Sequence, residues 1–250
     1  MGNGTGAGGV EGAYALAMPA QIFGRDAELR TISEFVAQIP NAPGALVLAG
    51  PAGGGKTTLL RAGAATAGDQ GFTVLRTIPA RSDLRLAFAG LADLLEPHIG
   101  AVIGELPPPQ ATALRIALLL QEAPAHPAEP QVIAAAFRTA LGVLAQSAPV
   151  LVVIDDLPWL DPPTSAALSF AIRRLTDEPV GLVCAQRTDQ FGKLPLDLEH
   201  AHLRADLLPV GGLSLGPGLP PGGQDRLDQG LPGIRQVSAI STPDDHDRDL

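Results

Sequence analysis

The sequence predicts an α/β fold in which a parallel sheet of about five strands carries helices on both faces. Two observations lead to this prediction. Short apolar runs alternate along the chain with longer stretches of helical periodicity, which is the pattern of strand-helix-strand units. The short runs are apolar throughout and do not alternate with polar residues, as expected of strands that are buried on both faces.

The first part of the chain predicts a helix, a strand, a second helix and a second strand. Asp26 is expected to cap a helix with an apolar stripe formed by Leu29, Ile32, Phe35 and Val36. Residues 45–49 are an apolar run between turn residues and predict a buried strand. A glycine-rich loop and a helix from Thr57 follow, and Gly71 precedes the second expected strand, residues 72–77.

The middle of the chain predicts three helices. Asp83 is expected to cap the first, which presents Phe88, Leu91 and Leu95. The three prolines at 107–109 open the second. The third has a 3.6-residue rhythm of Ile133, Phe137, Leu141 and Leu144, and Pro149 ends it.

Three more strands are expected at residues 150–154, 180–185 and 207–210, the last being the weakest. Leu168, Ile172 and Leu175 line a helix between the first two of them. Ligands of such sheets bind outside the carboxyl ends of the strands. The residues that follow each strand are therefore the candidates for a functional site.

The composition excludes several classes of protein. The 250 residues carry a net charge of −9 and no local basic patch, so no direct nucleic-acid binding is expected. The single cysteine, Cys184, cannot form an intrachain disulfide or a cysteine-based zinc site. No apolar stretch approaches the roughly 18 to 20 residues that a membrane helix needs, so no membrane partner is expected. Residues 1–20 predict a flexible leader without a signal peptide, and the expected compartment is the cytoplasm.

The loop after the first strand has the pattern G-x-x-x-x-G-K-[ST], which binds nucleotide phosphates when it lies between a strand and a helix. Glycines let backbone N–H groups approach anionic oxygens, and the helix start adds its dipole. Lys56 supplies a positive charge for the terminal phosphates, and the hydroxyl of Thr57 suits Mg²⁺. The predicted phosphate-binding residues are Gly50, Pro51, Ala52, Gly53, Gly54, Gly55, Lys56, Thr57 and Thr58.

Two carboxylates end the most strand-like run, residues 150–154. A carboxylate at the end of a buried strand is costly to desolvate unless it meets a cation. Asp155 is therefore the expected metal-side residue, acting through a water, and Asp156 is expected to orient or deprotonate the attacking water. An aspartate that only caps the next turn is the alternative.

Arg187 follows the fourth expected strand on the same edge of the sheet. It can reach a terminal phosphate from there and report its presence. The alternative is a solvated surface arginine.

Residues 23–215 resemble the ATPase domain of the large LuxR-type transcriptional regulators, in the STAND branch of the AAA+ P-loop proteins. The resemblance rests on the phosphate loop, on the segment Phe23-Gly-Arg25-Asp-Ala-Glu28-Leu29, and on two segments between them and the acidic strand, residues 72–76 and 87–91. The segment Asp155-Asp-Leu-Pro-Trp159-Leu-Asp161 is its most diagnostic part.

The resemblance implies an ATP-dependent switch in which the nucleotide state controls the assembly or the exposure of an attached DNA-binding region. The implied ligands are ATP or ADP and Mg²⁺, and the implied partner is a second copy of the chain in nucleotide-dependent self-association. It places Gly24 and Arg25 by the adenine, Asp155 at the metal, Asp156 at the water and Arg187 as a sensor of the γ-phosphate. Trp159 is explained equally well as a core aromatic under the next helix.

The sequence departs from the family at three points. Pro158 stands where the family often has a polar residue, and Asp156 where many relatives have Glu, so slow hydrolysis is expected. Full family members continue through a lid, helical repeats and a helix-turn-helix. Here residues 211–250 hold 8 Gly and 5 Pro without apolar periodicity, which predicts a poorly ordered tail at 216–250 and suggests a truncated or out-of-frame product.

Three functions remain open at this stage. The first is an ATP-binding, slowly hydrolysing regulatory ATPase domain that spans residues 21–215. The second is a nucleotide-sensing interaction module without turnover, and the third is a non-functional fragment. Guanine-specific GTPases are disfavoured because neither Asn3 nor Asn41 lies in an Asn-Lys-x-Asp loop. A small-molecule kinase remains possible in principle.

Overall fold

The computed structural model describes residues 24–122, 129–187, 196, 198, 201, 203–211 and 235–236. The predicted leader, residues 1–20, and most of the predicted tail, residues 216–250, lie outside this part of the chain.

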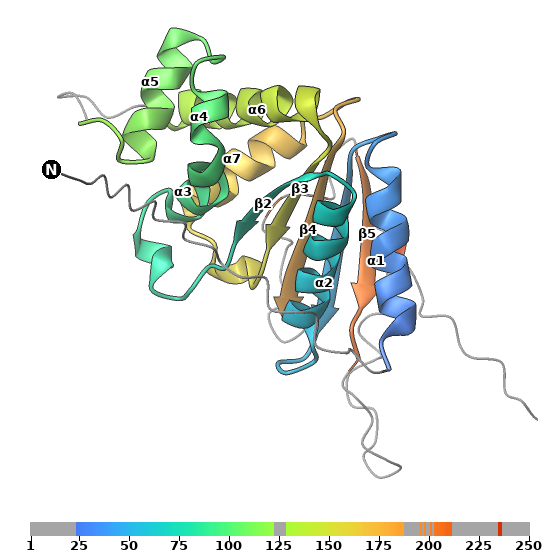
Figure 1. Ribbon diagram of the computed structural model, residues 1–250. Helices are drawn as coiled ribbons and strands as arrows, with labels where there is room; N and C mark the ends of the chain where they lie inside the picture. The colour runs from blue at the N-terminus through green and yellow to red at the C-terminus, as the bar shows by residue number, and fades with distance from the viewer. Residues whose placement is uncertain are drawn as a thin grey trace, which may run out of the picture.

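A parallel sheet with the strand order β2-β3-β4-β1-β5-β6 forms the centre of the molecule (Figure 1). All of its strand pairs are parallel. The strands are β1 (Gly44–Gly50), β2 (Thr73–Thr77), β3 (Val150–Ile154), β4 (Val180–Arg187), β5 (Arg204–Pro209) and the two-residue β6 (Arg235–Gln236). The order places β1 between β4 and β5. The α/β fold with a parallel sheet is thus confirmed, with five main strands and the short β6 added.

Two helices cover one face of the sheet, α1 (Asp26–Gln38) and α2 (Lys56–Asp69), as Figure 1 shows. Their apolar side chains form one core with alternate residues of the strands. It includes Ile32, Val36, Leu59, Leu46, Leu48, Val153 and Val183, each at most 1% exposed. Burying such a side chain contributes about 1.5–3 kcal/mol, so this layer fixes α2 and the loop before it.

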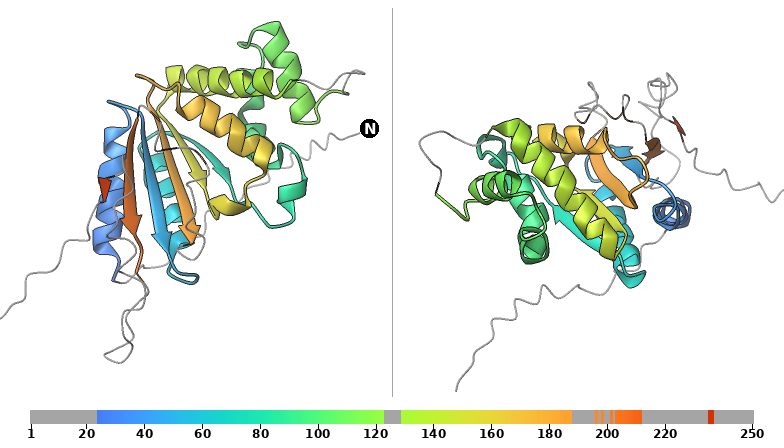
Figure 2. Two further views of the ribbon diagram at one scale, coloured as in Figure 1. Left: turned by 180° about the vertical axis from the view of Figure 1, so that it is seen from behind. Right: turned by 90° about the horizontal axis from the view of Figure 1, so that it is seen from above.

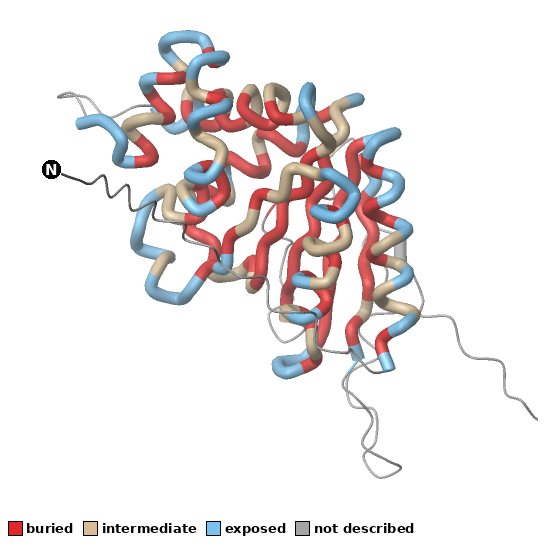
Figure 3. The backbone as a smooth tube through the Cα atoms, viewed as in Figure 1, coloured by how far each residue is buried: buried red, intermediate tan, exposed pale blue. Residues whose placement is uncertain are grey.

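The remaining helices cover the opposite face, which Figure 2 shows from behind. They are α3 (Ala89–Leu95), α4 (Ile99–Val102), α5 (Pro108–Ala117), α6 (Pro130–Ser147) and α7 (Pro162–Ile172). The described residues also form three 3₁₀ turns. The turn η1 (Asp83–Arg85) lies between β2 and α3, η2 (Glu96–His98) between α3 and α4, and η3 (Leu157–Trp159) between β3 and α7. Figure 3 shows that the sheet between the two helical layers is almost wholly buried.

The prediction that Asp83 caps a single helix was wrong. Asp83 begins the turn η1, and α3 starts only at Ala89. Phe88 separates the two because its backbone lies in the left-handed region at φ 63°, which a helix cannot pass through.

The prediction that Asp26 caps the first helix was also wrong. Arg25 is the residue before α1, and Asp26 is the first helical residue, where its charge suits the helix dipole. The last residue of the predicted stripe at 168–175, Leu175, lies beyond the end of α7 but is still buried.

Candidate functional site

The loop that follows β1 has the backbone of an anion cradle. Gly53 and Gly55 lie at φ 73° and 86°, in the region that favours glycine. Gly50 contacts the end of β5 so closely that an added Cβ would lie 2.1 Å from the carbonyl oxygen of Val210. The glycines of this loop therefore permit both its turn and its contact with the neighbouring strand.

The helix α2 begins directly at the end of this loop. No side chain among the described residues caps it, and the first N–H groups of an α-helix have no acceptor within the helix itself. Lys56 is 7% exposed, and its Nζ donates to the carbonyl oxygens of Gly50 at 3.0 Å and Pro51 at 2.8 Å. Uncapped N–H groups and an ammonium group at a helix start suit a phosphate group.

The other predicted phosphate-binding residues lie in the same loop and in the first turn of α2. Pro51, Ala52, Gly53 and Thr58 are exposed, Gly54 is buried, and Thr57 is partly buried. Gly24 is exposed, with a positive φ of 70°, just before α1. Nothing in the described residues tests the predicted adenine contact of Gly24.

Asp155 follows the last residue of β3 and is 5% exposed. Its N–H donates to the carbonyl oxygen of Thr77 at 3.2 Å, which extends the β2-β3 pairing by one residue. Thr77 is itself held by its hydroxyl, which donates to Asp93 Oδ2 at 2.8 Å. The neighbouring strand thus fixes the backbone that carries this carboxylate.

Asp156 has a left-handed backbone, φ 52° and ψ 56°, which costs a non-glycine residue about 1–3 kcal/mol. It precedes η3, but its side chain makes no capping hydrogen bond, so the alternative of a purely capping aspartate does not describe it. Burial and then the neighbouring Asp155 raise the pKa of Asp156, while Lys56 and Arg187 act to lower it. Both cations therefore lie within electrostatic reach of this carboxylate.

The register of the sheet explains why these distant residues meet. Arg187 is the last residue of β4 and pairs with Gly50, the first residue of the loop. On the other side of β4, Ile154 pairs with Cys184, so the acidic pair follows β3 beside the last residues of β4. The three predicted segments thus share one edge of the sheet.

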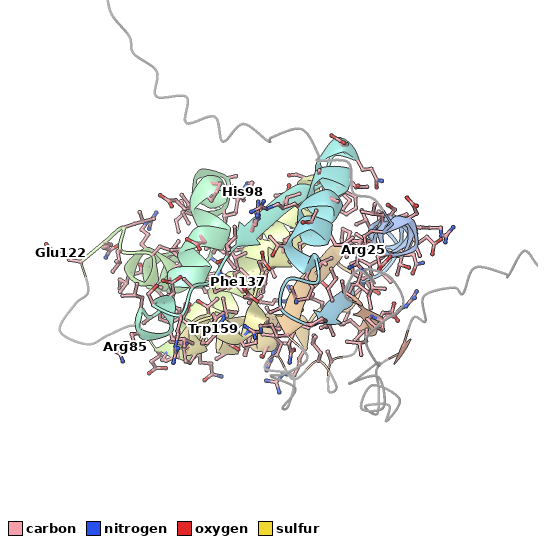
Figure 4. The ribbon with its side chains drawn as sticks, turned by 90° about the horizontal axis from the view of Figure 1, so that it is seen from below. Arg25, Arg85, His98, Glu122, Phe137 and Trp159 are labelled. Carbon is pink, nitrogen blue, oxygen red and sulfur yellow. The ribbon has the colours of Figure 1, made fainter. Side chains whose placement is uncertain are left out.

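Arg25 is buried at the same edge, with 7% of its surface exposed. Its Nη1 pairs with Glu28 at 2.7 Å, and its Nη2 donates to the carbonyl oxygens of Gly54 at 2.8 Å and Gly211 at 2.6 Å. Figure 4, which looks at the molecule from below, shows Arg25 close to α1. The guanidinium group therefore joins α1, the phosphate loop and the residue that follows β5.

Sequence reasoning missed the structural role of Asp161, which is 1% exposed. It caps α7 by accepting from the N–H of Thr164, and it also accepts from the N–H groups of Phe88 and Gly90. Thr164 Oγ1 accepts from the N–H of Leu91. The start of α3 is thus capped by another helix. The sequence Asp161-Pro-Pro-Thr is a recognisable helix start, but its long-range partners leave no signal.

Two arginines near this edge were also missed. Burial, and then the positive charge of Arg61, lower the pKa of Arg76 on β2. The carboxylate of Asp155 acts on Arg76 in the opposite direction. Arg81 lies over the ring of Trp159, 5.6 Å from its centroid. Trp159 is only partly buried, so it is a rim residue with a cationic partner and not a core aromatic.

Two further features of the described residues concern metal ions and cavities. No group of three or more His, Cys, Asp and Glu side chains is placed to hold a metal ion by itself, so a metal here would need oxygen atoms from another ligand. A cavity of about 320 Å³ between α5 and α6 is lined by Pro107, Pro109, Gln110, Gln131, Val132 and Ala135. It carries no charged residue and lies away from the phosphate loop.

The phosphate loop, the acidic end of β3 and the strand order define a P-loop nucleotide-binding domain. The family model of the AAA ATPase domain matches residues 21–183, and the chain belongs to this family. No curated protein has a matching sequence. The described part of the chain contains no helix that is both long and apolar enough to cross a membrane.

Several solved structures resemble the chain. The ORC1 protein of Aeropyrum pernix in complex with DNA is 18% identical, with a TM-score of 0.44, over 78% of this chain and 46% of that one. AMPPCP-bound DnaA from Aquifex aeolicus is 13% identical, with a TM-score of 0.39, over 75% and 46%. PCH-2 of C. elegans is 16% identical, with a TM-score of 0.35, over 74% and 40%. The chain thus spans less than half of each of these structures, and the likeness concerns the fold alone.

Proposed function

We propose that the chain binds ATP together with Mg²⁺ and hydrolyses it slowly, as the regulatory ATPase domain of a LuxR-type transcriptional regulator. One observation carries the nucleotide part of this proposal. The sheet register brings three segments to one edge of the sheet, although they are far apart in sequence: the loop that carries Lys56, the acidic end of β3 and Arg187 at the end of β4. Opposite charges at the rim of a glycine-rich loop suit a triphosphate and its divalent cation.

Each residue of the site has its own role toward the triphosphate in this proposal. The N–H groups at the start of α2 bind its oxygens, and Lys56 exchanges its two carbonyl partners, Gly50 and Pro51, for phosphate oxygens. Arg187 approaches the terminal phosphate from the end of β4. Asp156 orients the attacking water and accepts its proton, and a raised pKa makes it a better proton acceptor.

The donor set at this edge fits Mg²⁺. Thr57 and Asp155 would hold the ion, since a hydroxyl and a carboxylate are the oxygen ligands that magnesium takes beside phosphates and waters. The bound ion supplies neutralisation of the charge on the phosphates.

Calorimetric titration of the purified chain with ATP, with and without Mg²⁺, tests the proposal. The wild type is expected to bind ATP more tightly with Mg²⁺, and Lys56→Ala is expected to lose binding. Arg61→Ala is the matched control, because it removes a positive charge from the exposed side of the same helix. Absence of binding by the wild type, or equal binding by Lys56→Ala, would end the proposal.

The second candidate is a nucleotide-sensing module without turnover. It is favoured by the aspartate at position 156, whose side chain is one methylene shorter than the Glu of many relatives and reaches less far toward an attacking water. Steady-state phosphate release decides between the two. Release by the wild type that vanishes in Asp156→Asn supports hydrolysis, whereas equal background release by both proteins supports sensing.

The regulatory part of the proposal concerns assembly in the cytoplasm. We propose that ATP favours self-association of the chain and ADP does not, and that DNA is bound by another region of the full regulator. The acidic net charge of −9 supports the absence of direct nucleic-acid binding. Light scattering coupled to gel filtration, in ATP and in ADP, tests the first point, and a mass independent of nucleotide would contradict it.

A further inference from the structure

We infer that Arg25 is a positioning residue of the phosphate loop, which it orients and ties to the end of β5, and that its guanidinium group does not read the adenine. This inference rests on the proposed nucleotide binding. The inferred role of Arg25 is to hold the phosphate loop in the conformation that binds phosphate. This role takes the place of the adenine contact that the family resemblance implies for the Arg25 side chain.

The contacts of Arg25 leave its guanidinium group committed to the protein. Two carbonyl oxygens, of Gly54 and Gly211, accept from Nη2, and the Glu28 carboxylate pairs with Nη1. The side chains of Arg25 and Glu28 are 9% and 12% exposed. The ion pair is therefore shielded and internally neutralised, so little of the positive charge remains for a ligand.

The hydrogen bond to Gly54 fixes the orientation of one peptide of the loop. In a trans peptide the C=O and the following N–H point in opposite directions. When Arg25 holds the Gly54 oxygen, the N–H of Gly55 is turned away from the guanidinium group. This peptide joins two glycines, Gly54 and Gly55, so the chain has little rotational preference of its own here. The hydrogen bond from the buried guanidinium group of Arg25 to the Gly54 carbonyl oxygen fixes the orientation of this peptide.

The hydrogen bond to Gly211 extends this constraint to β5. The end of that strand already contacts the loop at two points. The N–H of Val210 donates to the Ala49 carbonyl at 2.6 Å, and the Val210 carbonyl lies against Gly50. Arg25 adds a third point, one residue further along the chain. The shape of the phosphate loop and the exit of the chain from β5 are therefore coupled through one side chain.

Competition with a fluorescent ATP analogue, in the presence of Mg²⁺, separates a loop-positioning role from an adenine contact. The competitors are ATP and inorganic tripolyphosphate, which has the phosphates but no base. If Arg25 orients the loop, Arg25→Ala should weaken both competitors by the same factor, about tenfold for one charged hydrogen-bond group. Arg30→Ala is the control, because Arg30 is an exposed arginine of α1, the helix that follows Arg25, and its loss should leave both affinities unchanged.

Two results would overturn the inference. A loss confined to ATP would make Arg25 a base contact, and unchanged affinity for both competitors would make it dispensable. If Arg25→Ala does not fold by circular dichroism, Arg25→Lys is measured instead, and the same equal loss is expected because one ammonium group cannot reproduce the three contacts. If the wild type binds neither ATP nor tripolyphosphate, the proposed function itself is refuted. If the wild type binds both and Arg25→Ala still binds tripolyphosphate as tightly as the wild type, only the inference about Arg25 is refuted.

Discussion

Two glycines of the sheet offer a test in which the same added methyl group meets very different neighbours. A Cβ at Gly50 would lie 2.1 Å from the carbonyl oxygen of Val210, with the Val210 carbonyl carbon and Cβ at 3.1 and 3.2 Å. A Cβ at Gly181 would lie 2.2 Å from Cδ1 of Ile39. The overlap is nearly equal, but a backbone carbonyl cannot move without its strand, whereas the end of an isoleucine can change rotamer.

The expected free energies of unfolding follow from this difference. Gly50→Ala should lose about 3 kcal/mol or more, since relief requires separation of the β1-β5 contact, and Gly181→Ala only about 1 kcal/mol, within the range for overpacked cores. Gly68→Ala is the control. Gly68 is exposed in α2, nothing lies within 4 Å of its added Cβ, and alanine there should stabilise the protein by about 0.5–1 kcal/mol.

Urea unfolding followed by circular dichroism measures the three variants against the wild type. The expected order of stability is Gly68→Ala, wild type, Gly181→Ala and then Gly50→Ala. If Gly50→Ala proved as stable as Gly181→Ala, the close contact between the phosphate loop and the end of β5 would be refuted. The coupling inferred for Arg25 would lose part of its basis as well.

Three other predictions concern residues around the site and the core. Asp161→Ala should lose about 3 kcal/mol in urea unfolding because three N–H groups, two of them buried and one partly buried, lose their acceptor. Asp161→Asn should lose less, and a loss under about 1 kcal/mol for Asp161→Ala would contradict the role assigned to Asp161. Burial raises the pKa of Cys184 to about 12, so a thiol reagent at pH 8.5 should label it only in urea, and rapid labelling of the native protein would place it at the surface instead. Burial acts to raise the pKa of Glu178, but hydrogen bonds from backbone N–H groups and the charge of Arg138 lower it overall. Its stabilisation is therefore present above pH 4.5 and is lost as the pH falls through the folded-state pKa. Glu178→Gln should melt lower than wild type at pH 7, and this difference should shrink as the pH falls below 4.5, whereas a difference independent of pH would exclude the linkage.

Much of the fold is predictable because the strands are buried on both faces. Runs such as residues 150–154 have no polar residue, and their boundaries in the structure match the apolar run. The fifth strand was predicted three residues late, at 207, because it starts with Arg204 and contains Asp206, which pair with each other at 2.6 Å. An ion pair at the start of a buried strand has no hydropathy signature.

Some residues of the candidate site were predictable from the sequence, and others were not. Lys56, Asp155 and Arg187 were predicted because the loop after β1, the residue after β3 and the end of β4 all lie at the carboxyl edge of one parallel sheet, so topology alone brings them together. The partners of Arg25 were not predictable, because Gly211 lies 186 residues away in sequence and a carbonyl oxygen is available at almost every residue. The hydrogen bonds that Asp161 accepts at the start of α3 were not predictable either, because their backbone N–H donors are far away in sequence.

The central claim is that the phosphate loop and the acidic end of β3 act on one nucleotide and its divalent ion. The Mg²⁺ dependence of ATP affinity in Lys56→Ala and Asp155→Asn tests it most directly. Asp155→Asn should bind ATP with the same affinity whether or not Mg²⁺ is present, while Lys56→Ala should lose affinity under both conditions. If Asp155→Asn kept the full Mg²⁺ enhancement of the wild type, the two segments would not share a ligand and the account would be contradicted.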